Sequence, residues 1–179
     1  MTQTHAVTTP GPSFETVVAA TLIGSALVHA TVVEEHLAEW TPAGVFFLLL
    51  VAGETLLGVA ALRVWSRPLA WLVAGSSLLT VATWTVSRTT GMPLGPADFR
   101  VPEAVGLPDL ACCGLELVAA AVAVWSLRHP LGHPVAPPRP LVVAAVLAAV
   151  VVTVTATAPA LRGGHDAHHD HASAAATTR

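Results

Sequence analysis

The sequence has no lysine, and charged residues of all kinds make up only 11% of its 179 positions. A soluble domain of this size carries far more charge on its surface, so this class of fold is excluded. Only two cysteines occur, Cys112 and Cys113, and adjacent cysteines rarely satisfy disulfide geometry. The formal net charge of −3 offers no basic surface, so we expect no nucleic-acid partner.

Apolar residues fill the chain instead, at 54% of all positions with a mean hydropathy of +0.68. They form long runs of the ~20 residues that cross ~30 Å of hydrocarbon. The runs predict an all-α polytopic transmembrane helix bundle of five spans, a four-helix core plus a C-terminal span, with the lipid bilayer as partner. The expected spans are residues 14–37, 41–65, 68–88, 107–127 and 141–161. We expect disordered tails at 1–13 and 162–179, and a first run retained as a span because no Lys or Arg precedes it.

The arginines indicate the orientation of the bundle. Short connections beside helix ends carry Arg63, Arg67, Arg128 and Arg139. The positive-inside rule is most reliable for such positions, so we expect a multi-pass cell-membrane protein with a cytoplasmic N-terminus and an extracytoplasmic C-terminus. With five spans, the first turn, the connection before the fourth span and the C-terminal tail share one side in either orientation.

Three ionisable residues, His29, Glu54 and Glu116, lie at membrane depth, where each costs several kcal/mol. They should therefore face one another or a shared pocket. His29 and His36 are seven residues apart, as are Asp109 and Glu116, so each pair shares a helix face. Because the first and fourth spans are antiparallel, His36 and Asp109 should lie at the rim, with His29 and Glu116 deeper. The spacing favours a functional site for His29 with Glu116, and leaves Glu54 open between function and interhelical hydrogen bonding.

Other polar residues of the spans have simpler interpretations. Cys112 and Cys113 are predicted to be small packing residues, and Arg88 is predicted to extend toward the lipid headgroups. The acidic residues at the end of the first span are interpreted as a solvated helix end: Glu34, Glu35 and Glu39.

The segment HDAHHDH near the C-terminus combines imidazoles with carboxylates, a donor set that suits Zn²⁺, Cu²⁺ or Ni²⁺. It is either a weak collector of metal or a solvated tail without function. The candidate metal ligands of the whole chain are His29, His36, Asp109, Glu116, His165, His168, His169 and His171.

The sequence WTVSRTTGMPLGP, followed by PEAVGLPDLACCGLEL, resembles a group of small polytopic membrane proteins common in high-GC bacteria. That group has an SRTTGLPLGP-like loop, an acidic start to the next helix and an upstream span bearing His and Glu. The resemblance covers residues 14–128, with Met92 where the group has leucine. It implies a membrane location and a helical architecture, and no particular activity.

Three functions are consistent with these patterns. The first is extracytoplasmic binding or handling of a divalent transition metal, and the second is a structural or accessory membrane subunit. The third is a proton-coupled carrier or membrane enzyme, which we favour least because no nucleophile motif, phosphate loop or cofactor fingerprint occurs. We therefore predict no catalytic residues and no cofactor other than the metal, and the sequence indicates no particular protein partner.

Overall fold

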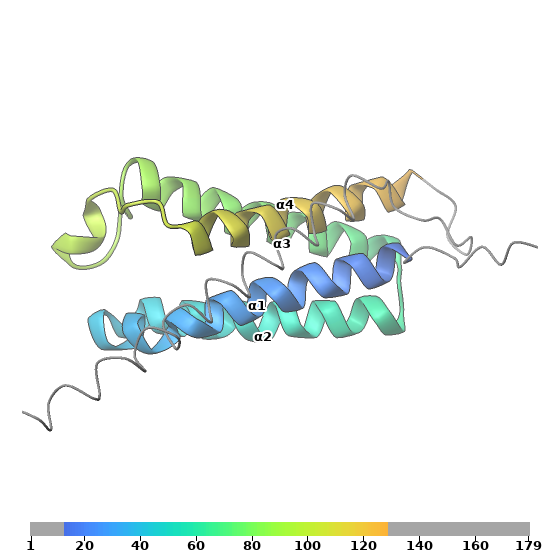
Figure 1. Ribbon diagram of the computed structural model, residues 1–179, viewed down its shortest axis with the longest axis horizontal. Coiled ribbons are helices and arrows are strands. Elements are labelled where there is room, and N and C mark those ends of the chain that lie inside the picture. Colours follow the sequence, from blue (N-terminus) through green and yellow to red (C-terminus); the bar gives the residue numbers. More distant parts are fainter. Residues whose placement is uncertain (1–12, 129–179) are drawn as a thin grey trace, which may run out of the picture.

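The computed structural model describes residues 13–128, which form four long helices. They are α1 (Phe14–Glu39), α2 (Thr41–Arg63), α3 (Arg67–Thr89) and α4 (Leu107–Leu127), with a short 3-10 helix η1 (Ala97–Arg100) between α3 and α4 (Figure 1). No strand occurs within this part of the chain. The structure thus confirms the all-helical prediction and its first four spans, whereas the predicted span 141–161 and both tails lie outside the described residues.

All four helices are long and apolar enough to cross a membrane, with mean hydropathy between 1.5 and 2.3 in their most apolar windows. Large apolar side chains project outward from α2 and α3, including Leu56, Leu79 and Trp71, each more than 60% exposed. Water would disfavour so much exposed apolar surface, whereas lipid tails would not. The four helices therefore fit an integral membrane protein.

Proline and serine define where the helices begin. Pro42, Pro68 and Pro108 stand in the first turns of α2, α3 and α4, where a backbone N–H has no helical partner. The Ser66 side chain caps α3 by accepting a hydrogen bond from the Leu69 backbone N–H at 3.4 Å. The α2 helix ends at Arg63, two residues before the end of the predicted span 41–65, and the turn before α3 starts at residue 64.

The helices pair as two antiparallel hairpins, α1 with α2 and α3 with α4, which form the two layers in Figure 1. The layers are joined mainly by α1 against α4, while α2 and α3 touch little. The main core lies at the end where α1 begins and α4 ends, and Phe14 and Trp65 close it with an edge-on ring contact of 5.4 Å. At the opposite end the space between α2 and α3 stays open.

The connection between α3 and α4 folds back over this open end. Gly91 and Gly95 adopt positive φ angles of 76° and 104°, which side chains disfavour. A Cβ at Gly91 would also lie 2.4 Å from the Arg100 carbonyl group, so only glycine fits there. The fold-back brings the Phe99 ring within 5.5 Å of Trp40, the single residue between α1 and α2. The loop and the first turn thus meet above the open end.

Candidate metal centre

Three buried ionisable side chains converge in the middle of the bundle, one each from α1, α2 and α4. One ligand atom from each of His29, Glu54 and Glu116 lies within 4.8 Å of the other two. All three residues are buried: His29 is 8% exposed, Glu54 6% and Glu116 1%. His29 Nε2 lies 3.3 Å from Glu54 Oε1. The prediction that these residues face one another is confirmed, while their role as metal ligands stays a prediction.

Two polar residues extend this cluster along the α1–α4 contact. Ser25 lies one turn before His29, and Cys112 one turn before Glu116, so each pair shares a helix face. The Ser25 hydroxyl donates a hydrogen bond of 2.6 Å to Glu116 Oε1. Cys112 Sγ lies 3.2 Å from Ser25 Oγ and 3.5 Å from His29 Nε2. Cys112 is buried as expected of a packing residue, but its thiol faces polar groups.

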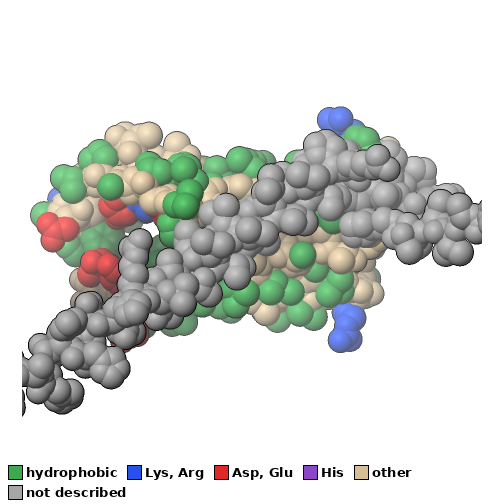
Figure 2. Space-filling view, viewed as in Figure 1, with side chains coloured by type: hydrophobic (Ala, Val, Ile, Leu, Met, Phe, Trp, Pro, Cys, Tyr) green, Lys and Arg blue, Asp and Glu red, His purple; other side chains and the backbone are tan. Residues whose placement is uncertain are grey.

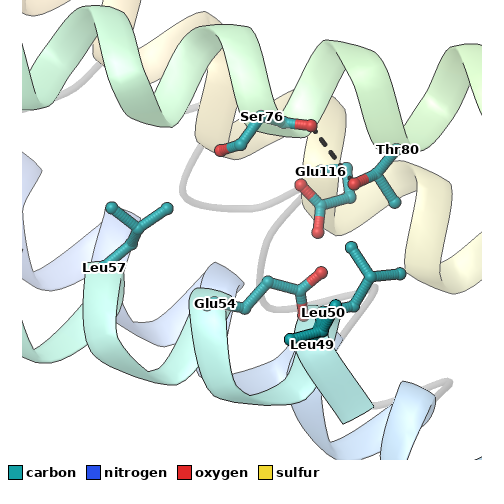
Figure 3. Close-up of a pocket in the computed structure, with 8 residues that line it drawn as sticks. Leu49, Leu50, Glu54, Leu57, Ser76, Thr80 and Glu116 are labelled. Carbon is teal, nitrogen blue, oxygen red and sulfur yellow. Dashed lines mark hydrogen bonds between the residues drawn. The ribbon is translucent and has the colours of Figure 1, made fainter. Parts of the chain in front are cut away.

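Glu54 is the least satisfied member of the cluster. Both of its carboxyl oxygens are buried, and neither makes a hydrogen bond of standard geometry to any described residue. A buried polar group left without a partner costs roughly 1–3 kcal/mol, and a charged one costs more. Figure 3 shows the Glu54 and Glu116 carboxyl groups pointing toward one another beside a cavity of about 190 Å³ between α2 and α3. The carboxyl group of Glu54 therefore has room for a further partner.

A second, larger cavity of about 780 Å³ runs from His29 and Glu116 to the open end of the bundle. Phe46, Phe47 and Trp84 line its walls. Acidic residues line its outer part: Glu35, Glu39, Asp98, Glu103 and Asp109. Figure 2 shows acidic side chains with some arginine atoms beside them at this end of the molecule, and further arginine side chains at the other end. Arg88 also lines the outer part of the cavity and pairs with Glu103 and Asp109, so the mouth of the cavity carries an excess of acidic over basic residues.

The two predicted rim residues line this cavity without joining the cluster. His36 Nδ1 lies 2.8 Å from the Val32 carbonyl oxygen, and its ring lies 4.4 Å from the Phe47 ring. Asp109 Oδ2 accepts a hydrogen bond of 2.8 Å from the Gly106 N–H. The rim position expected for both residues fits, but the structure groups Glu54, rather than either of them, with His29 and Glu116.

Arg88 lies in the last turn of α3 beside the folded-back loop, and its extension toward the lipid headgroups stays a prediction. Its side chain is only 14% exposed and forms ion pairs with Glu103 and with Asp109, the latter at 3.1 Å. Glu103 belongs to the folded-back loop, and its N–H donates to the Ser87 carbonyl oxygen at 3.2 Å. Two carboxylates therefore offset the charge of this guanidinium.

The end of α1 agrees with its interpretation as a solvated helix end. Its three glutamates, Glu34, Glu35 and Glu39, are exposed. The predicted tail ligands lie outside the described residues: His165, His168, His169 and His171.

Sequence reasoning missed Ser25 and Glu103 and left Glu54 undecided. Glu54 is the single charged residue in the apolar body of α2, and this isolation was the available signal. No family model, no curated protein and no solved structure matches the chain, so the site is interpreted from its own chemistry.

Proposed function

We propose that this chain is an integral membrane protein that binds a divalent transition metal at His29, Glu54 and Glu116. The observation that carries the proposal is the convergence of these three buried ligand atoms within 4.8 Å, with no hydrogen bond to either carboxyl oxygen of Glu54 from the described residues. One imidazole and two carboxylates are ligands that Zn²⁺ and its neighbours accept. A cation between them would offset the buried negative charge and give Glu54 a partner in addition to His29.

The spacing of the cluster supports this assignment. Metal–nitrogen and metal–oxygen bonds of about 2.0–2.2 Å place two ligand atoms of a tetrahedron about 3.3–3.5 Å apart. His29 Nε2 and Glu54 Oε1 are already 3.3 Å apart. Because all ligand atoms lie within 4.8 Å, small side-chain rotations bring Glu116 to the same distance.

The charge distribution supports delivery of a cation from outside the cell. The carboxylates at the cavity mouth attract cations and raise their local concentration. The opposite end of the bundle carries Arg63, Arg67 and Arg128. The positive-inside rule favours a cytoplasmic location for that end, which would make the mouth extracytoplasmic.

The test is metal binding by the purified full-length chain in detergent, measured by elemental analysis and by competition titration with Zn²⁺, Cu²⁺ and Ni²⁺. The four tail histidines are changed to alanine, so that they do not contribute to the binding that is measured. We expect about one ion per chain.

Changes beyond the direct ligands of metal sites typically cost 10–100-fold in affinity. His29→Ala and Glu54→Gln, which each remove a direct ligand, should therefore cost at least about 100-fold. Glu34→Gln, an exposed change on α1, is the control and should leave affinity unchanged.

A structural or accessory role is the alternative, favoured by the 2.6 Å hydrogen bond from Ser25 to Glu116 that joins α1 to α4. In that case His29→Ala and Glu116→Gln would lower stability or abundance, and the chain with the four tail histidines changed to alanine would bind no metal. Absence of binding, or binding unaffected by His29→Ala, contradicts the metal proposal.

A further inference from the structure

We infer that Cys112 supplies a sulfur ligand to the same site, so that the bundle selects a borderline cation such as Zn²⁺ or Co²⁺ over hard cations such as Mg²⁺, Ca²⁺ and Mn²⁺. This inference rests on the proposed function and adds the donor set that determines which ions are accepted. Thiolate sulfur favours softer metal ions, whereas an all-oxygen site favours the hard ones.

The distance between nitrogen and sulfur fits a shared metal ion. Bonds of about 2.0–2.1 Å to imidazole and about 2.3 Å to sulfur place the two atoms of a tetrahedral site about 3.5–3.6 Å apart. His29 Nε2 and Cys112 Sγ are 3.5 Å apart. The 3.3 Å approach of Glu54 shares this nitrogen. Cys112 lies outside the group whose ligand atoms are all within 4.8 Å of one another, so its side chain would turn toward Glu54 and Glu116 when a metal ion binds.

The direction of these approaches argues against a proton relay. In a nucleophile–base–orienter arrangement, the nucleophile and the orienting carboxylate contact opposite nitrogens of the imidazole. Here the Cys112 thiol and the Glu54 carboxyl group both approach Nε2 of His29. A proton on Nε2 can be donated at full strength either to the thiol or to the carboxyl group. A metal ion bound to Nε2 would instead have His29, Cys112 and Glu54 as ligands together. The geometry therefore suits ligation better than nucleophilic catalysis.

Ser25 connects the two ligands from α4. Its Oγ lies 3.2 Å from Cys112 Sγ and donates to Glu116 Oε1 at 2.6 Å. Groups that hydrogen-bond to ligands fix ligand orientation in metal sites. Cys112 is 6% exposed, while its neighbour Cys113 is half-buried and, among the described residues, forms no hydrogen bond with His29 or Ser25. Cys112 is thus the proposed ligand, and replacement of the adjacent Cys113 serves as the matched control.

The experiment uses Co²⁺ alone as the probe, added to the full-length chain with the four tail histidines changed to alanine. A cobalt–thiolate bond gives a near-ultraviolet charge-transfer band that nitrogen and oxygen ligands do not give. Because the chain has only two cysteines, Cys113→Ser contains Cys112 alone. We expect the band in the unmodified chain and in Cys113→Ser, and its loss in Cys112→Ser. Cys112→Ser should also lower Zn²⁺ affinity at least tenfold relative to Mn²⁺ affinity.

The outcomes separate the inference from the proposed function. Co²⁺ binding that depends on His29 but gives no charge-transfer band overturns the sulfur ligand and leaves the metal site standing. A band that is lost in Cys113→Ser overturns the assignment to Cys112. No Co²⁺ or Zn²⁺ binding at all overturns both. If Cys112→Ser fails to fold, Cys113→Ser still decides, because it keeps the thiol in question.

Discussion

The two halves of this bundle are built differently. The half that contains the ends of α2 and α4 is filled with small and branched apolar residues, and its core includes Val18, Val73, Ala119, Val122 and Ala123, each fully buried. The half toward the α3–α4 loop holds the 780 Å³ cavity and the ionisable cluster. Small residues let helix backbones approach closely, whereas aromatic and charged side chains hold them apart.

The difference shows how a small membrane bundle can hold expensive polar groups. Packing in one half fixes the relative positions of α1 and α4, which contribute most of the buried residues. The carboxyl oxygens of Glu54 can then remain without hydrogen bonds, because the packed half supplies stability that the open half lacks. We expect mutations in the packed half to affect folding and mutations in the open half to affect binding.

The largest expected effect comes from removing a side chain of the packed half. Leu22 is 1% exposed and belongs to the core, whereas Leu50 lines both cavities. Leu22→Ala should lower the free energy of unfolding by about 2–5 kcal/mol, because the packed surroundings cannot fill the space. Leu50→Ala enlarges an existing cavity and should cost less than half as much. Unfolding in mixed detergent micelles measures both, and equal losses would contradict the division into a packed and an open half.

The helices, and the meeting of His29 with Glu116, could be predicted from the sequence. Length and hydropathy located all four described helices. The spacing of His29 and Glu116 also predicted their meeting, because they lie ten and nine residues from the ends of α1 and α4 that face the loop.

The open half could not be predicted to the same degree, for two physical reasons. The α2 helix is apolar on all sides, so its sequence does not reveal which face Glu54 shares with the bundle. The partners of Arg88 depend on how the loop folds back at Gly91, a long-range arrangement that local spacing does not encode. The helices were therefore predictable, whereas the contacts between the loop and the helix ends were not.

An intermediate effect is expected at the ion pairs that hold the loop. Arg88→Gln leaves Glu103 and Asp109 facing each other without the guanidinium, and should destabilise the closed loop by about 1–3 kcal/mol. Hydrogen exchange of residues 90–106 should then be faster, while exchange in the packed half stays unchanged. Arg100→Gln is the matched control, since Arg100 is exposed and donates to the Gly95 carbonyl oxygen. If exchange rises equally in both halves, Arg88 supports the whole bundle rather than the open end.

The smallest effect should appear in the rate of metal binding. Glu35 and Asp98 line the cavity mouth, whereas Glu34 is exposed beside it and does not line the cavity. Removing one mouth charge, by Glu35→Gln or Asp98→Asn, should slow Zn²⁺ association by about 2- to 5-fold at low ionic strength, because these charges concentrate cations near the entrance. The difference should shrink in high salt, which screens exposed charges. Stopped-flow mixing with a Zn²⁺ indicator measures the rates. Glu34→Gln should leave the rate closer to that of the unmodified chain, and an equal slowing by all three changes would mean that ions respond to the general charge of this end rather than to the cavity mouth.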